Sequence, residues 1–213
     1  MTNNEYFEKL NIVNGNLKSF RKEYLNLARS IVGETLLKED LFFCASLDKG
    51  IRVLDGFISM INERNLTCVG VLVRMQIDNC FRTYAPFIAK NKEEVIDTII
   101  YSKKELRQCL TNKDKKMRDS VLLEELSVFD GAIIDVYKQA SGYVHLSEKA
   151  FYAIARTADS SLLTLNIGGE LDERCNDAIV EGVSAFSYFT KLQQKILREV
   201  AESKERFDKT YRE

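Results

Sequence analysis

The chain has 213 residues and nearly balanced charge, with 31 Lys and Arg against 32 Asp and Glu and a formal net charge of −1. This balance excludes a strongly basic nucleic-acid-binding protein and an acidic tail, so any nucleic-acid contact has to be local. Hydrophobic residues make up 45% of the chain and charged residues 30%, as in a folded globular protein. The length predicts a single domain over residues 1–213.

The numbers of cysteine and histidine residues limit the disulfides and metal sites that the chain can form. Five cysteines, odd in number and set among apolar residues, predict free thiols in a reducing compartment. With His145 as the single histidine, sites that need two or three imidazoles are excluded, and we expect no metal and no cofactor. The N-terminus lacks a secretory pattern, and charges interrupt every apolar run before it could span a bilayer. We therefore expect a cytoplasmic protein without a membrane segment.

Apolar residues recur at three- and four-residue steps along most of the chain, which predicts a mainly all-α fold, an antiparallel helical bundle. The first helix is expected from about Asn4 to Ile31. After a break at Gly33 and a short apolar stretch, Ser46 has the features of a helix start. That second helix should end at Asn62 to Asn65.

The run from Leu66 to Ala89 is almost wholly apolar, yet it carries Arg74, Asp78 and Arg82 at four-residue intervals. On a helix these three share one face, and charges on a buried helix must be paired. We expect Arg74 and Asp78 to bond each other. Two cations against one anion leave a guanidinium in search of a carboxylate, a phosphate or a carbonyl, so the pattern fits a salt-bridge ladder or a binding site. Pro86 should kink or end this helix.

The helical rhythm continues beyond Pro86. Asn91 is the expected N-cap of the next helix. Basic residues then concentrate between 103 and 118, in a pattern that fits a solvated helix end with its loop or a phosphate-binding patch. A further helical pattern runs from Val121 to His145, where Asp130-Gly131 could divide it into two helices.

Near the C-terminal end the apolar period changes. Apolar residues alternate at two-residue spacing between about 151 and 167, which predicts a small β-hairpin around Ser160 or a pair of short extended arms. A last helix is expected from Leu171 to about Arg206, with Asp172 as its N-cap. The charged residues from Glu202 to Glu213 are expected to fray or to be solvated.

Hydroxyl and imidazole groups cluster before that hairpin. The segment holds Tyr137, Ser141, Tyr143, His145 and Ser147, which together could form one hydrogen-bonded network. A lone histidine at a helix end is also favoured for packing and capping. The Ser-His pair by itself does not indicate a nucleophile, because no oxyanion-hole or orienting-acid motif accompanies it.

The segment Val136 to Ser147, taken with the helix that carries Arg74 and Arg82, resembles uncharacterised bacterial helical proteins related to the HEPN superfamily. Those proteins pair an arginine-bearing helix with a later tyrosine-serine-histidine segment. The resemblance implies a homodimeric helical bundle of a defence or toxin-antitoxin type system, whose active members bind and cut RNA without a metal. Lys138 occupies the position of the motif arginine, with six residues between it and His145. Lysine offers charge to a phosphate but lacks the bidentate fork of arginine.

The resemblance implies a site with two sets of residues. The expected catalytic residues are His145, Lys138, Ser141 and Arg74, and the expected substrate-binding residues are Arg82, Asp78, Tyr143 and Ser147. In this hypothesis His145 acts as the general acid or base and lies within reach of the face from Arg74 to Arg82. The alternative is a non-catalytic helical interaction module, in which the same polar network holds helices in register.

Overall fold

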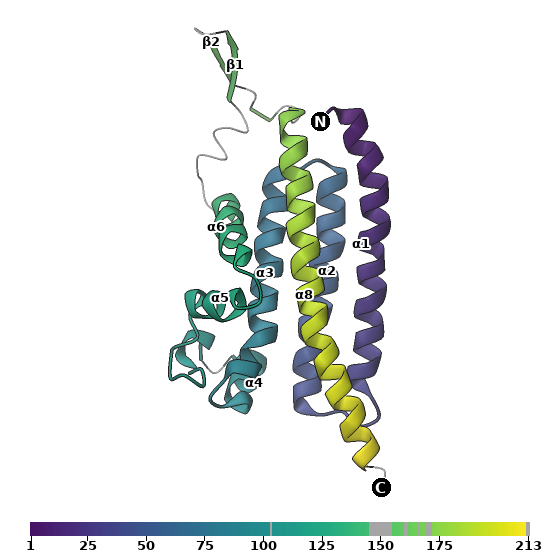
Figure 1. Ribbon diagram of the computed structural model, residues 1–213, viewed down its shortest axis with the longest axis vertical. Helices are drawn as coiled ribbons and strands as arrows, with labels where there is room; N and C mark the ends of the chain where they lie inside the picture. Colours follow the sequence, from purple (N-terminus) through teal and green to yellow (C-terminus); the bar gives the residue numbers. More distant parts are fainter. Residues whose placement is uncertain (103, 145–154, 160–161, 166, 169–171, 212–213) are drawn as a thin grey trace.

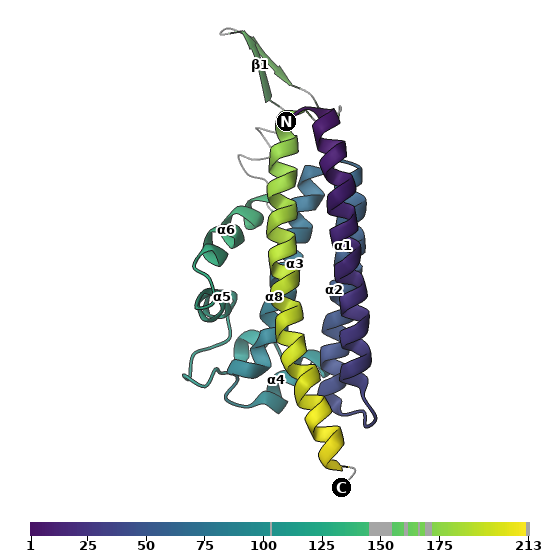
Figure 2. The same cartoon turned by 45° about the vertical axis from the view of Figure 1, so that its right-hand side comes forward.

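The computed structural model describes residues 1–102, 104–144, 155–159, 162–165, 167–168 and 172–211. It is organised around long helices that lie side by side (Figure 1), namely α1 (Asn3–Val32), α2 (Lys38–Asn62), α3 (Leu66–Ile88) and α8 (Arg174–Tyr211). Shorter elements cover the outer side of α3 (Figure 2), namely α4 (Lys92–Tyr101), the 3-10 helix η1 (Leu106–Gln108), α5 (Asp119–Ser127) and α6 (Ala132–Val144). The predicted mainly all-α fold is confirmed.

Two short strands, β1 (Ala155–Asp159) and β2 (Leu162–Leu165), pair antiparallel beyond one end of the long helices (Figure 1). The register places Ala155 opposite Leu165 and is interrupted between Thr157 and Asp159.

Consecutive helices α1, α2 and α3 alternate in direction, but α8 runs parallel to α1 and α3. At one end Asn3 N donates to Glu173 at 3.0 Å, and at the other Glu34 N donates to Asp208 at 3.0 Å. The expectation of an antiparallel arrangement is therefore wrong for α8. The physical reason is the long connection from α4 to β2, which carries the chain back to the end where α3 begins (Figure 1).

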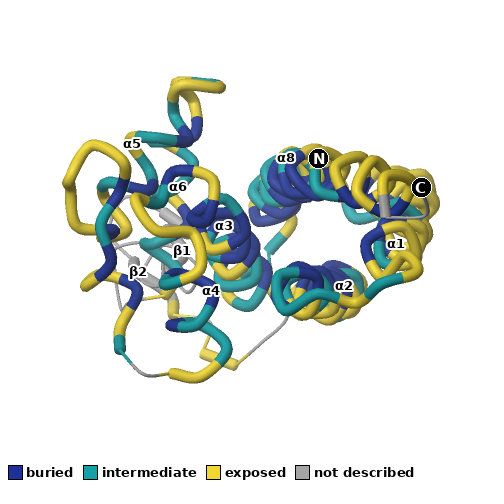
Figure 3. Tube along the Cα trace, turned by 90° about the horizontal axis from the view of Figure 1, so that it is seen from below, coloured by how far each residue is buried: buried dark blue, intermediate teal, exposed yellow. Residues whose placement is uncertain are grey.

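The core lies between the four long helices, whose buried sides face one another (Figure 3). Phe57 of α2 and Phe186 of α8 stack there with ring centroids 3.9 Å apart. A Cβ atom at Gly50 would lie 3.0 Å from side-chain atoms of both Tyr24 and Gln193, so glycine permits the close approach of α2 to its neighbours. Twelve of the 23 residues of α3 are buried, because α3 has long helices on one side and shorter ones on the other.

Local signals placed several helix ends correctly. The Asn91 side chain accepts from Glu94 N at 3.1 Å, which confirms the predicted N-cap of α4. The expected division at Asp130-Gly131 is also confirmed, since Asp130 Oδ1 accepts from Ala132 N at 2.9 Å just as α6 begins. Helix α3 runs through Pro86 and ends two residues later, so the proline lies in the last turn and not in the middle of the helix, as expected.

Three predicted boundaries need correction. Ser46 lies inside α2 and starts no helix, because its hydroxyl is used in the core, where Gln193 Nε2 donates to it at 3.0 Å. Helix α8 begins at Arg174, whose N–H is accepted by the Asp172 carboxylate at 2.9 Å. It continues to Tyr211, so the residues from Glu202 to Tyr211 are helical. Most of them are exposed, as expected, but Lys204 and Asp208 are buried.

Candidate functional site

The candidate site is built around Arg74, which reaches from α3 to α6. Its guanidinium donates to Tyr137 Oη at 2.8 Å and to Ser141 Oγ at 3.3 Å, and the guanidinium carbon lies 4.2 Å from the centroid of the Tyr137 ring. The Tyr137 ring in turn stacks on Phe81 of α3 at a centroid distance of 5.7 Å. The Arg74 side chain is 13% exposed, so these contacts fill most of its surface.

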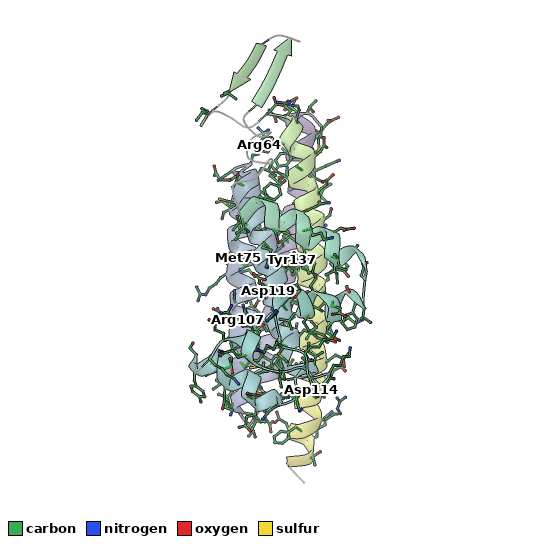
Figure 4. The ribbon with its side chains drawn as sticks, turned by 90° about the vertical axis from the view of Figure 1, so that its left-hand side faces the viewer. Arg64, Met75, Arg107, Asp114, Asp119 and Tyr137 are labelled. Atoms are coloured by element: carbon green, nitrogen blue, oxygen red, sulfur yellow. The ribbon has the colours of Figure 1, made fainter. Side chains whose placement is uncertain are left out.

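Two carboxylates pair with Arg74. Asp78, one turn further along α3, forms an ion pair with it, which confirms the predicted bond. Asp119 at the start of α5 lies 3.4 Å from the other terminal nitrogen, and Figure 4 shows Asp119 next to Tyr137 on this face. Burial lowers the pKa of Arg74, but the hydrogen bond and charge of Asp78 outweigh it, and the pKa lies above its ordinary value. Arg74 is therefore not the guanidinium left without a partner, and of the two arginines on this helix only Arg82 lacks an ion pair among the described residues.

We call Arg74 and the four residues that bond it, Asp78, Asp119, Tyr137 and Ser141, the Arg74 cluster. Arg82 is not part of this cluster. Arg82 is exposed and lines a separate groove with η1 and the start of α5. The expectation of one shared face is therefore wrong at this position. Each four-residue step overshoots a 3.6-residue turn by about 40°, so two steps turn Arg82 well away from Arg74.

The residues expected on α6 separate into three environments. Ser141 lies in the Arg74 cluster, and its hydroxyl also donates to the Tyr137 carbonyl at 2.8 Å. Lys138 is exposed and forms no ion pair within the described part of the chain. The Tyr143 ring packs on α3 at Gly70, where an added Cβ would lie 2.2 Å from Tyr143 Cγ, and burial raises its pKa. Helix α6 thus contributes Ser141 and Tyr137 to the cluster, with Lys138 facing solvent.

His145 and Ser147 lie outside the described residues. The prediction that His145 reaches the face from Arg74 to Arg82 therefore stays a prediction.

A second polar network, which the sequence analysis missed, crosses the core between α1, α2, α3 and α8. Tyr24 Oη donates to Gln193 Oε1 at 2.6 Å, and Gln76 Nε2 lies 2.9 Å from the same oxygen. Gln193 Nε2 donates in turn to Thr83 Oγ1 at 3.1 Å. Burial raises the pKa of Tyr24, so its phenol stays protonated and serves as a donor. The available signal was Gln76 itself, an uncharged amide within a helix whose apolar residues predict burial.

Comparisons of the chain with models of known protein families, with curated proteins and with solved structures return no match. Among the described residues, His, Cys, Asp and Glu side chains do not gather in threes as a metal ion would require. Within the same residues, no helix is both long enough and apolar enough to cross a membrane.

Proposed function

We propose that this chain is a HEPN-like helical bundle with a small β-hairpin that works as a non-catalytic interaction module, and that the Arg74 cluster is structural. The observation that carries the proposal is the saturation of Arg74 by two carboxylates and two hydroxyl groups in a largely buried setting. A guanidinium that stabilises a phosphate transition state has to present donors to the substrate. Arg74 instead uses its donors to join α3 to α5 and α6.

The competing proposal is metal-independent RNA cleavage, as the family resemblance implies. Lys138 favours it, because this side chain is exposed and without an ion pair in the described part of the chain, next to a cluster that holds Ser141. In this alternative Lys138 supplies charge to the phosphate and His145 transfers the proton. The two proposals differ in whether the protein cleaves RNA and in whether replacement of His145 abolishes that cleavage.

The expected result with RNA is that purified protein leaves a mixed RNA pool intact in the presence of a chelator. Cleavage is followed by gel electrophoresis for the wild type and for His145→Ala, together with the melting temperature of each. A general acid or base contributes a factor of ~10²–10⁴ in rate. Cleavage by the wild type that disappears in His145→Ala at unchanged melting temperature contradicts the non-catalytic proposal and favours the ribonuclease.

Self-association is the second part of the proposal. The resemblance suggests a homodimer, and large apolar side chains gather on the surface where α5 meets the end of α3. Phe129 is 52% and Phe87 48% exposed, and both rings pack against Tyr84. Exposed aromatic groups of this kind mark association surfaces. These residues are therefore the first to change in a test of dimerisation.

We expect light scattering at tens of micromolar to give twice the chain mass for the wild type and a monomer for Phe129→Asp. Tyr101→Asp is the matched control, because Tyr101 is 55% exposed on a different helix. A monomeric wild type contradicts the dimer. If Phe129→Asp is still a dimer, the interface lies on another surface.

A further inference from the structure

A basic groove lies where the side of α3 meets η1 and the start of α5, beside the Arg74 cluster. Its volume is about 930 Å³, and its walls carry the cations Arg82, Arg107, Lys116 and Arg118 with the carboxylates Glu105 and Asp119. Figure 4 shows Arg107 and Asp119 one below the other on this face of the molecule. Volumes of this size hold small-molecule ligands in other proteins, which typically need roughly 300–1,000 Å³.

Charge within the groove is not balanced. Glu105 forms an ion pair with Arg107, and Asp119 forms one with Arg74 outside the groove. Arg82, Lys116 and Arg118 are exposed and form no ion pair in the part of the chain that the structure describes. Because Asp78 also pairs with Arg74, the groove and the Arg74 cluster together hold five cations against three carboxylates, so positive charge remains in excess. Three cations on one concave surface repel each other unless an anion lies between them.

The floor of the groove is preformed. Leu106 and Met117 are 8% and 1% exposed and anchor the two loop segments in the core. Met117 N donates to the Cys109 carbonyl at 3.0 Å, which holds the segments that carry Arg107 and Lys116 together. The cations therefore stand on packed backbone, and an anion would meet them without first ordering a loop.

Other lysines of the sequence's basic concentration are neutralised at the surface. Lys104 pairs with Glu94, Lys113 with Glu125 at 2.7 Å and Lys115 with Glu124 at 3.1 Å. For these three lysines the structure agrees with the interpretation of the basic stretch as a solvated helix end with its loop. Among the described residues of this region, the uncompensated charge lies in the groove, and they form no extended basic track that could follow a polymer backbone.

We propose that this groove binds a small phosphate-bearing anion, with Arg82 and Arg118 as guanidinium donors and Lys116 as a point charge. Two guanidinium groups offer paired N–H donors that match phosphate oxygens. The start of α5 adds backbone donors, since its N-cap position is Arg118, whose side chain caps no N–H group. A diphosphate group, with several oxygens for the paired donors and a negative charge that offsets the excess of cations, fits this arrangement best. This inference is independent of the function proposed for the Arg74 cluster.

The test is isothermal titration of the full chain with inorganic pyrophosphate at low salt. Arg82→Gln, Lys116→Gln and Arg118→Gln remove one cation each from exposed positions, and each is expected to weaken binding by ~10-fold, the typical size of a hydrogen bond to a charged group. Lys195→Gln is the matched control, because Lys195 is exposed on α8 and does not line the groove. Wild-type affinity should also fall as sodium chloride rises.

Three results would overturn the proposal. The first is an absence of pyrophosphate binding by the wild type at millimolar concentration. The second is equal affinity in the wild type and all three groove variants, which would place the anion elsewhere. The third is binding of an RNA oligomer that depends on the groove cations while pyrophosphate does not bind, which would replace the small anion by a polymer.

Discussion

Replacement of Lys204 by methionine is expected to lower the free energy of unfolding by about 3–5 kcal/mol, the usual cost of breaking a buried ion pair. The Lys204 ammonium lies 3.1 Å from Asp40 and 3.3 Å from Asp208 and donates to the Thr35 carbonyl, and its side chain is 3% exposed. Methionine keeps the length of the side chain but leaves both carboxylates buried without their cation. Urea denaturation followed by circular dichroism measures the loss.

Lys209→Met is the control for this prediction. Lys209 also lies on α8 and pairs with Glu205 at 2.7 Å, but its side chain is 70% exposed. An exposed pair of this kind typically contributes less than about 0.5 kcal/mol. Equal losses in the two variants would show that the Lys204 contacts add nothing beyond a surface pair.

The pH dependence of the free energy of unfolding tests the same ion pairs of Lys204. Burial lowers the pKa of Lys204, but its hydrogen bonds to Asp40 and Asp208 outweigh that effect and leave the pKa above its ordinary value. The stabilisation is therefore fully present below about pH 10.4, the ordinary lysine pKa, and is lost as the pH rises through the folded-state pKa. Wild-type stability should fall across this alkaline range more steeply than that of Lys204→Met.

Lys204 also illustrates which parts of the fold were predictable from sequence. Apolar periodicity located the long helices, and short-range signals such as Asn91 and Asp130 located helix starts, because both depend on neighbours within a few residues. The buried ion pair of Lys204 with Asp40 joins α8 to the start of α2, at a distance of more than 160 positions along the chain. A charged stretch has the same pattern whether it is solvated or paired with a distant segment, so its burial was not predictable.

The candidate site divides in the same way. The bond between Arg74 and Asp78 was predictable because both residues lie on one helix, four positions apart. The pairing with Asp119 was not, since it depends on how α5 docks on α3. The opposite error arose at Arg82, where a regular four-residue spacing suggested a shared face and the helical pitch placed the side chain in the groove.

The second large effect is expected at Arg74. Arg74→Met should lower the free energy of unfolding by about 2–3 kcal/mol, because it removes hydrogen bonds to charged and polar groups and the cation–π contact with Tyr137. Asp78 and Asp119 would then face each other without the guanidinium between them. Arg82→Met, on the same helix but exposed and without an ion pair in the described part of the chain, should change stability by less than about 0.5 kcal/mol.

A double-mutant cycle of Arg74→Met with Tyr137→Phe measures how much of this stabilisation comes from the contact between the two side chains. The phenylalanine keeps the ring under the guanidinium and removes the hydroxyl that accepts at 2.8 Å, so the coupling isolates that hydrogen bond. A coupling of at least about 0.5 kcal/mol supports a structural cluster. If Arg74→Met instead leaves stability unchanged, the guanidinium does not hold α6 on α3. Its contacts would then be weak enough for a ligand to replace, and the case for a binding or catalytic role at Arg74 would be the stronger one.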